Sequence, residues 1–475
     1  MCIRDRTQAK TILDLASKVE PEFLAKLAVY ARQRGYLKDV PALLAAYLAA
    51  HSLPYFGAAF PHVIDNGKQI RNFAQIIRSG AVGRRSFGSS VRNTIRAWFN
   101  TRTPDQIFWN SIGSDPTIGD VLKMVHPKPP TPEHSALYSY LIGKGAISEN
   151  LLPDGLRDYN VYKQGEVTEF PRVPFEMLAG ILLTAEQWAQ LAKQMTWSQT
   201  RQSLNALARH GAFDQPGVTA MVADRLRDPE LIAKAKVYPY QLLAAYTAIG
   251  DKVTPEIGLA LQDAMEIALV NIPAYHGKVV VCPDVSGSMH TPVTGIRGSA
   301  TSKVNCNQVA GLICAAIVRK NPLADVIAFT TEATRVRLNP RDTVITNTEK
   351  IAVLPPGGTA ISAPLALLNK EQAAPDLVII VSDNQSWADF SLSRSLWRTP
   401  ATETMEQWAL LRTRNPNAKL VLIDLQPDAT SQVVDREDVL NVGGWSDAAF
   451  DVIGQFLSGE LTGDHWASLI RSVAL

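Results

Sequence analysis

Apolar side chains recur at helical spacing through the first 270 residues of the chain. In residues 21–35, Phe23, Leu24, Leu27 and Tyr30 fall on one face of a helix, with a proline in the first turn and a glycine at the end. The strict alternation of apolar and polar residues that is typical of half-buried strands is not evident here. The pattern therefore predicts a helical N-terminal region.

Similar amphipathic segments follow one another and are joined by short turns containing glycine or proline. We expect helices at residues 40–51, 64–79, 89–99, 116–125, 131–144, 173–184, 185–194, 197–210, 240–249 and 255–270. Such a succession is typical of an α-solenoid, in which helix pairs stack on their neighbours. A strict period of about 40 residues is not present. The prediction of a HEAT-like repeat therefore rests on the density of helices alone.

The pattern changes after residues 271–277, which read NIPAYHG. Near-continuous Val, Ile and Leu runs at 278–282, 324–329, 377–381, 419–423 and 439–442 alternate with amphipathic segments at 307–320, 363–369, 403–412 and 448–457. Buried strands separated by helices predict an α/β doubly wound parallel sheet. We therefore expect a helical domain over 7–270, a linker over 271–277 and an α/β domain over 278–475.

Composition is that of a globular protein without low-complexity tracts, with 46% hydrophobic and 19% charged residues. The longest apolar run, residues 42–50, is far shorter than the ~20 residues of a membrane span. The first residues lack the apolar core of a signal peptide. The four cysteines show neither metal-type spacing nor a disulfide framework. We therefore expect a cytoplasmic protein with no membrane association.

Positive charge is concentrated at the front of the chain. Residues 1–104 hold 16 Lys and Arg against 6 Asp and Glu, whereas residues 271–475 hold 17 against 20. A basic first quarter favours a polyanionic partner such as nucleic acid. The alternative is a set of solvated helix faces, because the basic residues are spread out and form no block of like charge.

Side chains with oxygen atoms lie at three connections between a strand or turn and the next segment of the predicted α/β domain. Asp284, Ser286 and Ser288 come directly after a strand, Thr359 ends a glycine-rich turn, and Asp383 ends another strand. Ligands of open parallel sheets bind at the carboxyl ends of the strands. Carboxylates and hydroxyls suit Mg²⁺, with Mn²⁺ as a substitute, whereas the lack of His and Cys argues against zinc. Alternatively, these residues only shape turns and cap helices.

The segments DVSGSM (284–289), GGT (357–359) and SD (382–383) resemble the metal-ion-dependent adhesion site of von Willebrand factor A domains. The resemblance implies that Asp284, Ser286, Ser288 and Thr359 contact a metal directly or through water, and that Asp383 assists. It also implies one open coordination position for an acidic group of a partner protein.

The helical half resembles TROVE-domain proteins, the family of the Ro 60-kDa autoantigen and its bacterial relatives. The resemblance is carried by EFLAKLAVYAR (22–32), GRRSFG (83–88), IRAW (95–98) and IGDVLKMVHPKP (118–129). In this family the helices close into a ring, small structured Y RNAs bind its basic outer surface, and single-stranded ends of misfolded RNAs enter its hole. The resemblance implies a monomeric protein that forms a ribonucleoprotein with RNA. It also implies a role in RNA quality control together with an exoribonuclease.

Seven basic residues are candidates for RNA contact. Arg92 and Arg96 are four residues apart on one expected helix, and further basic residues precede it or lie near the helix that we expect Asp115 to cap. The set is Arg84, Arg85, Arg92, Arg96, Lys123, His126 and Lys128. The alternatives are that His126 caps a helix end and that the arginines are solvated or ion-paired. We expect Trp98 and Trp109 in the core rather than stacked on bases.

The chain departs from the family pattern in two places. Residues 105–114 carry no basic residue, where animal relatives have a Lys- and Arg-rich helix. The resemblance also begins only near Thr7, and residues 1–6 have no counterpart in it. Part of the outer RNA surface, and the closure of the ring, are therefore expected to differ.

The sequence leaves three functions open. The first is RNA binding, with a metal-dependent site for an exoribonuclease or another protein with an acidic contact residue. The second is a metal-dependent protein-interaction adaptor without an RNA role. The third is an enzyme, which the sequence disfavours because it contains no catalytic triad order, phosphate-binding loop or general-base carboxylate pair.

Overall fold

The computed structural model describes residues 6–35, 37, 39–145, 147–164, 170–179, 181, 183–235, 237, 239–269, 272–295, 301–383, 402–426, 433, 436–444, 448–459 and 465–475. Its internal contacts divide the chain into two compact units. The first comprises Met1–Leu183 together with Asp464–Leu475, and the second comprises Thr184–Gly463. Each unit contains its own buried apolar residues.

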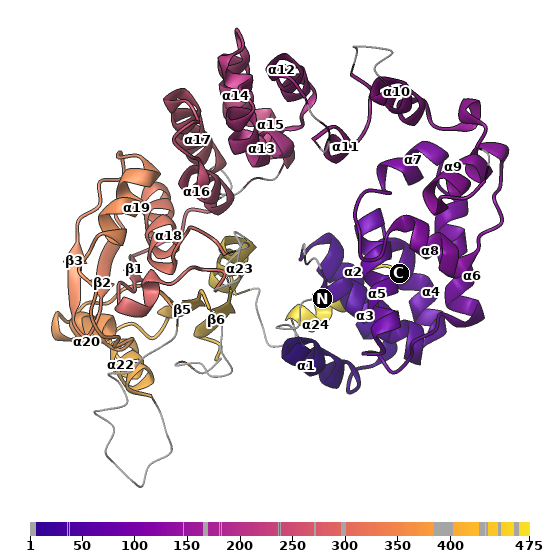
Figure 1. Ribbon diagram of the computed structural model, residues 1–475. Helices are drawn as coiled ribbons and strands as arrows, with labels where there is room; N and C mark the ends of the chain where they lie inside the picture. The colour runs from indigo at the N-terminus through magenta and orange to yellow at the C-terminus, as the bar shows by residue number, and fades with distance from the viewer. Residues whose placement is uncertain are drawn as a thin grey trace. The chain divides into compact units, whose positions relative to one another are not determined.

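The first unit is helical throughout its described part (Figure 1). Helices α2 to α5 pack on one another around large buried rings. Among these rings, Phe56 stacks on Phe73 with 5.7 Å between ring centres. The elements are α1 (Arg6–Ala16), α2 (Pro21–Gln33), α3 (Val40–His51), α4 (Leu53–Val63), α5 (Gly67–Ser79), α6 (Gly88–Asn100), α7 (Pro104–Trp109), α8 (Ile118–Val125), α9 (Pro132–Ile142), η2 (Glu149–Leu151), α10 (Asp154–Lys163), α11 (Phe175–Ala179) and α24 (His465–Arg471).

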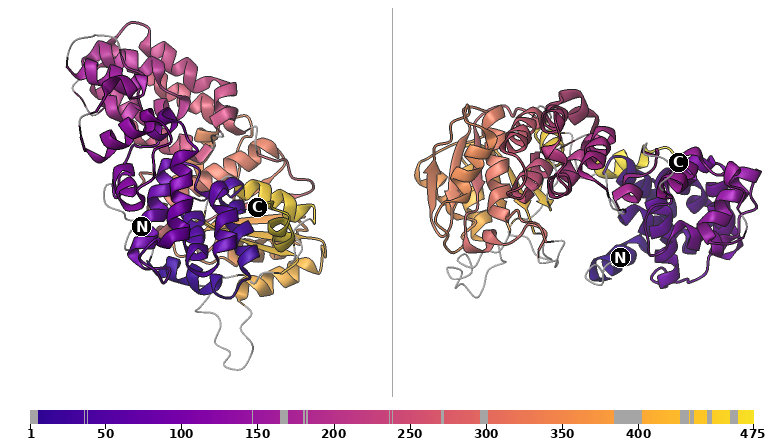
Figure 2. Two further views of the ribbon diagram at one scale, coloured as in Figure 1. Left: turned by 90° about the vertical axis from the view of Figure 1, so that its right-hand side faces the viewer. Right: turned by 45° about the horizontal axis from the view of Figure 1, so that its top comes forward.

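The last helix, α24, packs on α2 near the other end of the sequence. Lys26 donates a hydrogen bond from Nζ to the carbonyl of Arg471 at 2.9 Å. The Tyr30 ring meets Trp466 edge-on with 6.4 Å between ring centres. Figure 2 shows the indigo and purple helices of this unit from two further sides. The final twelve residues therefore belong with the first helices of the chain.

The second unit begins with a further set of helices. α14 and α16 pack against α17, and capping boxes at Thr184 and Thr196 begin α12 and α13. The elements are α12 (Ala185–Gln194), α13 (Trp197–Arg209), η3 (Ala212–Asp214), α14 (Val218–Arg227), α15 (Pro229–Ala235), α16 (Pro239–Ala248) and α17 (Pro255–Ala268). Packing thus groups these helices with the sheet that follows them, and the expected domain boundary at 271–277 stays a prediction; residue 271 lies outside the described residues.

A six-stranded sheet of order β3-β2-β1-β4-β5-β6 forms the core of the rest of the second unit. All pairings are parallel except the edge pair β2–β3. The strands are β1 (Val279–Pro283), β2 (Asp325–Phe329), β3 (Ala333–Val336), β4 (Leu377–Ser382), β5 (Lys419–Asp424) and β6 (Val439–Gly443). β1 and β4 are buried along their whole length, because helices cover both faces.

Helices lie on both sides of this sheet (Figure 1). α18 packs on β1 and β4 and also on α19, while α20 packs on β2 and on α22. On the side of α20 and α22, the core joins strand residues to the fully buried Trp408. The remaining elements are η5 (Gly287–His290), α18 (Cys306–Lys320), α19 (Val344–Ala352), α20 (Ala363–Lys370), α22 (Glu403–Arg412) and α23 (Ala448–Leu457).

The two expected fold classes are confirmed, with local corrections. The helix expected at 64–79 begins at Gly67, because the Asn66 side chain caps it by accepting from the amide of Gln69. The helix expected at 116–125 begins at Ile118, and its cap is Thr117 rather than Asp115. α1, α4, α7, α10, α14, α15, α19 and α24 were not expected, nor was the short antiparallel strand β3. None of the described helices is long and apolar enough to cross a bilayer.

Candidate metal centre and basic surface

The two candidate carboxylates lie side by side at the carboxyl end of the sheet. Asp284 directly follows β1 and Asp383 directly follows β4, its parallel neighbour. The Asp284 amide continues the ladder by donating to the carbonyl of Val381 at 2.8 Å. Ser382, the last residue of β4, donates its hydroxyl to Asp284 Oδ2 at 2.6 Å. Adjacent parallel strands therefore bring together residues about a hundred positions apart.

The two serines belong to the turn that Asp284 organises. The Ser286 amide donates to Asp284 Oδ1 at 2.8 Å, which folds the chain back toward the carboxylate. The hydroxyl oxygens of Ser286 and Ser288 lie 3.2 Å apart. Ser286 is fully buried, whereas Ser288 is partly exposed. The turn thus gathers one carboxylate and two hydroxyls at one point.

A glycine-rich loop brings Thr359 to the same end of the sheet. The Gly287 amide donates to the carbonyl of Gly357 at 3.0 Å, which joins this loop to the Asp284 turn. A side chain at Gly357 would place its Cβ 2.9 Å from Cβ of Thr330, so the close approach requires glycine. Thr359 itself is 2% exposed. All three predicted segments therefore converge.

Burial dominates the electrostatics of this cluster. Asp284 is 0% exposed and Asp383 is 2% exposed. Burial raises the pKa of Asp284 to about 6, and the negative charge of Asp383 adds to the rise, while hydrogen bonds from Ser382 and Ser286 oppose it. No described lysine or arginine is among the groups that shift this pKa. Two adjacent buried carboxylates form a negatively charged setting in which a bound cation would offset the cost of burying their charge.

The donor set fits a hard divalent cation. It offers carboxylate and hydroxyl oxygens, and its only acidic members are Asp284 and Asp383. Within the described residues, no group of three or more His, Cys, Asp or Glu side chains forms a cluster of its own. The site therefore has the oxygen ligands that Mg²⁺ accepts.

Two of the arginines expected to bind RNA have structural hydrogen bonds. The Arg84 guanidinium donates to the carbonyls of Ser86 at 2.8 Å, Ala49 at 2.6 Å and Phe87 at 2.6 Å. It thereby fixes the loop that precedes α6. Arg96 donates from Nε to the carbonyl of Val125 at 2.6 Å, at the end of α8. Both guanidinium groups keep only part of their hydrogen-bonding capacity for a ligand.

Arg92 lies one turn before Arg96 on α6, as the spacing predicts. Its side chain is half-buried, and its Nε atom is buried without a hydrogen bond. Arg85 is exposed and lies across Gly80, where an added Cβ would come 2.8 Å from the arginine Nε. Helix α6 and the loop before it thus present Arg85 more openly than Arg92.

Lys123, His126 and Lys128 are all exposed on or after α8. His126 ends the helix with a left-handed backbone, φ 50°, and its amide donates to Leu122 at 2.9 Å. Arg78 of α5, which was not among the candidates, lies against this helix with Nη1 3.8 Å from the sulfur of Met124. These five exposed basic residues make up the basic surface, defined here as Arg78, Arg85, Lys123, His126 and Lys128.

The two tryptophans differ in their burial. Trp98 is 4% exposed, donates from Nε1 to the carbonyl of Ile64 at 2.7 Å, and carries Arg102 over its ring at 3.9 Å. Its expected place in the core is confirmed. Trp109 is 46% exposed, so the same expectation is wrong there. α7 is a helix of only six residues and buries Ile107 and Phe108 instead.

Comparisons with known proteins agree with this architecture. Residues 278–457 match the family model of the Ro60 von Willebrand factor A domain. A protein of Deinococcus radiodurans named RNA-binding protein RO60 is 24% identical over 461 residues, covering 89% of this chain and 82% of that protein. The chain resembles Ro proteins over most of its length. A Caenorhabditis elegans protein of the same name is 24% identical over 267 residues, covering 53% of this chain and 38% of that protein.

The Ro resemblance extends to three-dimensional structure. The crystal structure of the Deinococcus radiodurans RO (RSR) protein matches with a TM-score of 0.67 at 20% identity, covering 97% of this chain and 94% of that chain. This likeness confirms the expected combination of a helical region and an A domain. The Deinococcus radiodurans and Caenorhabditis elegans relatives are each named as RNA-binding proteins.

Three polar residues at the carboxyl end of the sheet were not assigned a role from the sequence. Ser382 supports Asp284, as described above. Asp424 is paired in register with Ser382 and is 9% exposed. Gln426 reaches from the end of β5 to the carbonyl of Pro292 at 2.9 Å and to the sulfur of Cys306 at 3.3 Å. The strand expected at 419–423 ends one residue before Asp424, so its position at this edge could have been found.

Proposed function

We propose that this chain is the RNA-binding protein of a ribonucleoprotein. In this proposal it holds small structured RNAs on its basic surface and takes up single-stranded ends of misfolded RNAs. The match to the RNA-binding protein RO60 of Deinococcus radiodurans over 89% of the chain carries the proposal. The exposed cations of α5, α8 and the loop before α6 support it, because they are available to phosphates.

Binding on this surface is expected to depend on salt rather than on sequence. Each phosphate neutralised by Lys or Arg releases condensed counterions, so affinity falls steeply as salt rises. Arg78, Arg85, Lys123 and Lys128 are single exposed charges rather than base-reading pairs. The surface is therefore expected to recognise the shape of an RNA rather than the identity of its bases.

The Ro60-type A domain has a second role in the proposal, as a metal-dependent contact for a protein. Asp284, Ser286, Ser288 and Thr359 would hold Mg²⁺, and Asp383 would assist. When bound, the cation supplies an open coordination position for a carboxylate of the partner. An exoribonuclease with an exposed acidic residue is a partner of the required kind. The chain itself is proposed to bind and not to catalyse.

The first test is to purify the protein from its own cell and to sequence the RNA that accompanies it. Small hairpin RNAs and RNAs with single-stranded ends are the expected products. In solution, Lys123→Glu with Lys128→Glu should weaken hairpin binding about tenfold or more. Lys18→Glu, an exposed lysine of the same unit, is the matched control. A protein free of RNA that fails to shift hairpin or single-stranded RNA at low salt would contradict RNA binding.

The alternative, an adaptor without an RNA role, is favoured by the candidate metal centre alone. It predicts Mg²⁺-dependent capture of an acidic partner that is unchanged in the Lys123 and Lys128 variants. Chelation with EDTA separates the two activities, because hairpin binding on the basic surface does not require the metal. Loss of both activities in one variant would instead indicate misfolding.

A further inference from the structure

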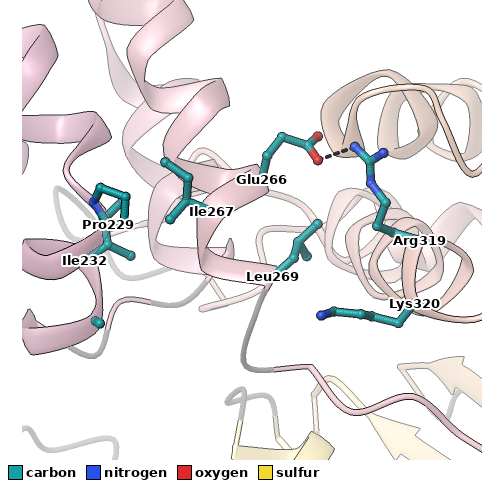
Figure 3. Close-up of a pocket in the computed structure, with 8 residues that line it drawn as sticks. Pro229, Ile232, Glu266, Ile267, Leu269, Arg319 and Lys320 are labelled. Atoms are coloured by element: carbon teal, nitrogen blue, oxygen red, sulfur yellow. Dashed lines mark hydrogen bonds and ion pairs between the residues drawn. The ribbon is translucent and has the colours of Figure 1, made fainter.

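An open groove lies among three helix ends of the second unit, apart from the candidate metal centre (Figure 3). It is formed by α15, the end of α17 and the end of α18, and has a volume of about 710 Å³. This volume falls within the range of about 300–1,000 Å³ that is typical of ligand pockets. The groove is lined by Pro229, Ile232, Ala233, Glu266, Ile267, Leu269, Arg319 and Lys320.

Aliphatic residues from two helices form one wall of the groove. Ile232 and Leu269 are almost fully buried and form a fixed apolar surface, while Ile267 is half-buried and Ala233 is exposed at the rim. Ile267, Ala233 and the exposed Pro229 supply the apolar surface that an apolar side chain of a ligand could remove from water, which is favourable in proportion to the area covered. The wall contains no aromatic side chain among its described residues, so it offers no stacking platform for a base.

The opposite side of the groove carries charge, most of which is already neutralised. Glu266 forms an ion pair with Arg319, shown by the dashed line in Figure 3. Arg319 also donates to the carbonyl of Pro340 at 3.1 Å, and Glu266 accepts from the amide of Val344 at 2.6 Å. These contacts hold both side chains in place. They supply a rigid frame rather than a charge for a ligand.

Lys320 is the cation that the frame leaves available. It is half-buried at the last position of α18 and forms no hydrogen bond or ion pair with a described residue. Figure 3 shows its ammonium group directed toward the space beside Leu269. A single ammonium next to an aliphatic wall is complementary to a carboxylate attached to an aliphatic body.

We propose that this groove binds a peptide segment of a partner protein in which leucine-type side chains adjoin an acidic residue. The aliphatic side chain would lie against Ile267 and Ala233, and the carboxylate would pair with Lys320. A single-stranded RNA fits less well, because the groove has one available cation, a fixed carboxylate and no aromatic ring among its described lining residues. The open form of the groove suits an extended peptide better than a fully enclosed small molecule.

The test uses the full chain and short peptides that carry a neutral dye. The probe is the hexapeptide Gly-Glu-Leu-Leu-Asp-Gly, measured by fluorescence anisotropy at physiological ionic strength. We expect weak, saturable binding with a Kd on the order of 100 µM. Replacing both leucines of the probe by alanine should weaken binding about tenfold or more, since the buried aliphatic area is lost. Replacing both acids by amides should weaken it as well.

Two variants of the protein examine the groove directly. Lys320→Glu should weaken binding of the acidic probe about tenfold, because an attraction becomes a repulsion. Ala233→Trp should weaken it by filling the groove from its rim. Lys370→Glu is the matched control, because Lys370 is also a lysine at the last position of an A-domain helix. It shares the small cost of an acid at a helix end but not the groove.

The outcomes are distinct. The proposal is supported if probe binding is lost in Lys320→Glu and Ala233→Trp and is kept in Lys370→Glu. Probe binding should also be unaffected by EDTA. Absence of saturable binding up to about 1 mM overturns it, as does equal binding by all variants. Displacement of the probe by hexauridylate would assign the groove to RNA, and self-association in sedimentation would assign it to a second copy. Because the metal centre is not involved, Asp284→Asn separates this proposal from the proposed function.

Discussion

Replacing Asp284 by asparagine is expected to affect stability in opposite directions with and without metal. The pKa of Asp284 is about 6 in the fold against 3.8 as its ordinary value, because the carboxylate is buried beside Asp383. Ionising it at pH 8 therefore costs the metal-free folded protein up to about 3 kcal/mol more than it costs the unfolded chain. Asparagine removes this cost and keeps an acceptor for the Ser286 amide and a donor toward Ser382. Without metal, the variant should be about 1–3 kcal/mol more stable.

Magnesium should reverse this order. At a free concentration one hundred times its Kd, a ligand that binds only the folded state stabilises it by about 2.7 kcal/mol. The wild-type chain should gain this amount, and Asp284→Asn should gain almost none. The sign also depends on pH. A carboxyl group with a raised pKa stabilises the fold below pH 3.8, and that contribution is lost as pH rises through about 6. The metal-free wild type should therefore lose stability over this window, whereas the variant should not.

The assay is calorimetric unfolding of the full chain at pH 5 and pH 8, in EDTA and in Mg²⁺. The unfolding transition of the A domain is the quantity compared, and each protein serves as its own reference with and without metal. Metal-free Asp284→Asn that is clearly less stable than wild type at pH 8 would refute the electrostatic reasoning. Equal stabilisation of both proteins by Mg²⁺ would refute the assignment of Asp284 as a ligand.

Three further predictions concern single side chains. Arg96→Ala should lower the stability of the first unit by about 1–2 kcal/mol in denaturant titrations, since the Val125 carbonyl loses its charged donor. Asp438→Asn should cost about 3 kcal/mol, because two arginines and a tryptophan indole lose a buried carboxylate. Burial raises the pKa of Asp438, but the hydrogen bond from Trp408 and the two arginines outweigh burial and hold this pKa below 3.8. The stability of the wild type should therefore fall on acidification below about pH 4, and that of the variant should change less. Gly357→Ala should weaken Mg²⁺ binding about tenfold in calorimetric titrations, because its Cβ would meet Thr330 at 2.9 Å; unchanged affinity would count against the placement of this loop.

The convergence of the metal-site residues could be predicted from the sequence because it follows from topology. Asp284 and Asp383 each end a buried strand, and parallel strands bring their carboxyl ends to one edge. Thr359 could be placed there because a glycine-rich turn precedes a helix. The metal itself stays a prediction, since the structure supplies only the arrangement of its proposed ligands.

The roles of the arginines could not be predicted in the same way. Arg84 and Arg96 donate to backbone carbonyls of other segments, and those carbonyls have no signature in the sequence. Spacing along a helix shows that Arg92 and Arg96 share a face, but not that α8 covers part of that face. Arg78 was missed for the related reason that its neighbour Met124 is on a different helix.

Short elements and distant pairings were also out of reach. β3 is an exposed edge strand of four residues, ATRV, too short for alternation to be recognised. The helix α24 has only seven residues, and its contact with α2 joins positions more than four hundred residues apart. Local patterns carry no information about such a partner.

The return of α24 to α2 makes the first unit discontinuous in the sequence. A fragment that stops at residue 183 would lack one of its own helices and expose the faces of Phe23 and Tyr30 that α24 covers. A chain shortened just after α23 would keep its whole sheet and yet be weakened near its first residues. The first unit therefore cannot be cut out as one uninterrupted stretch, whereas the second can, and an affinity tag attached directly after residue 475 would sit beside α2.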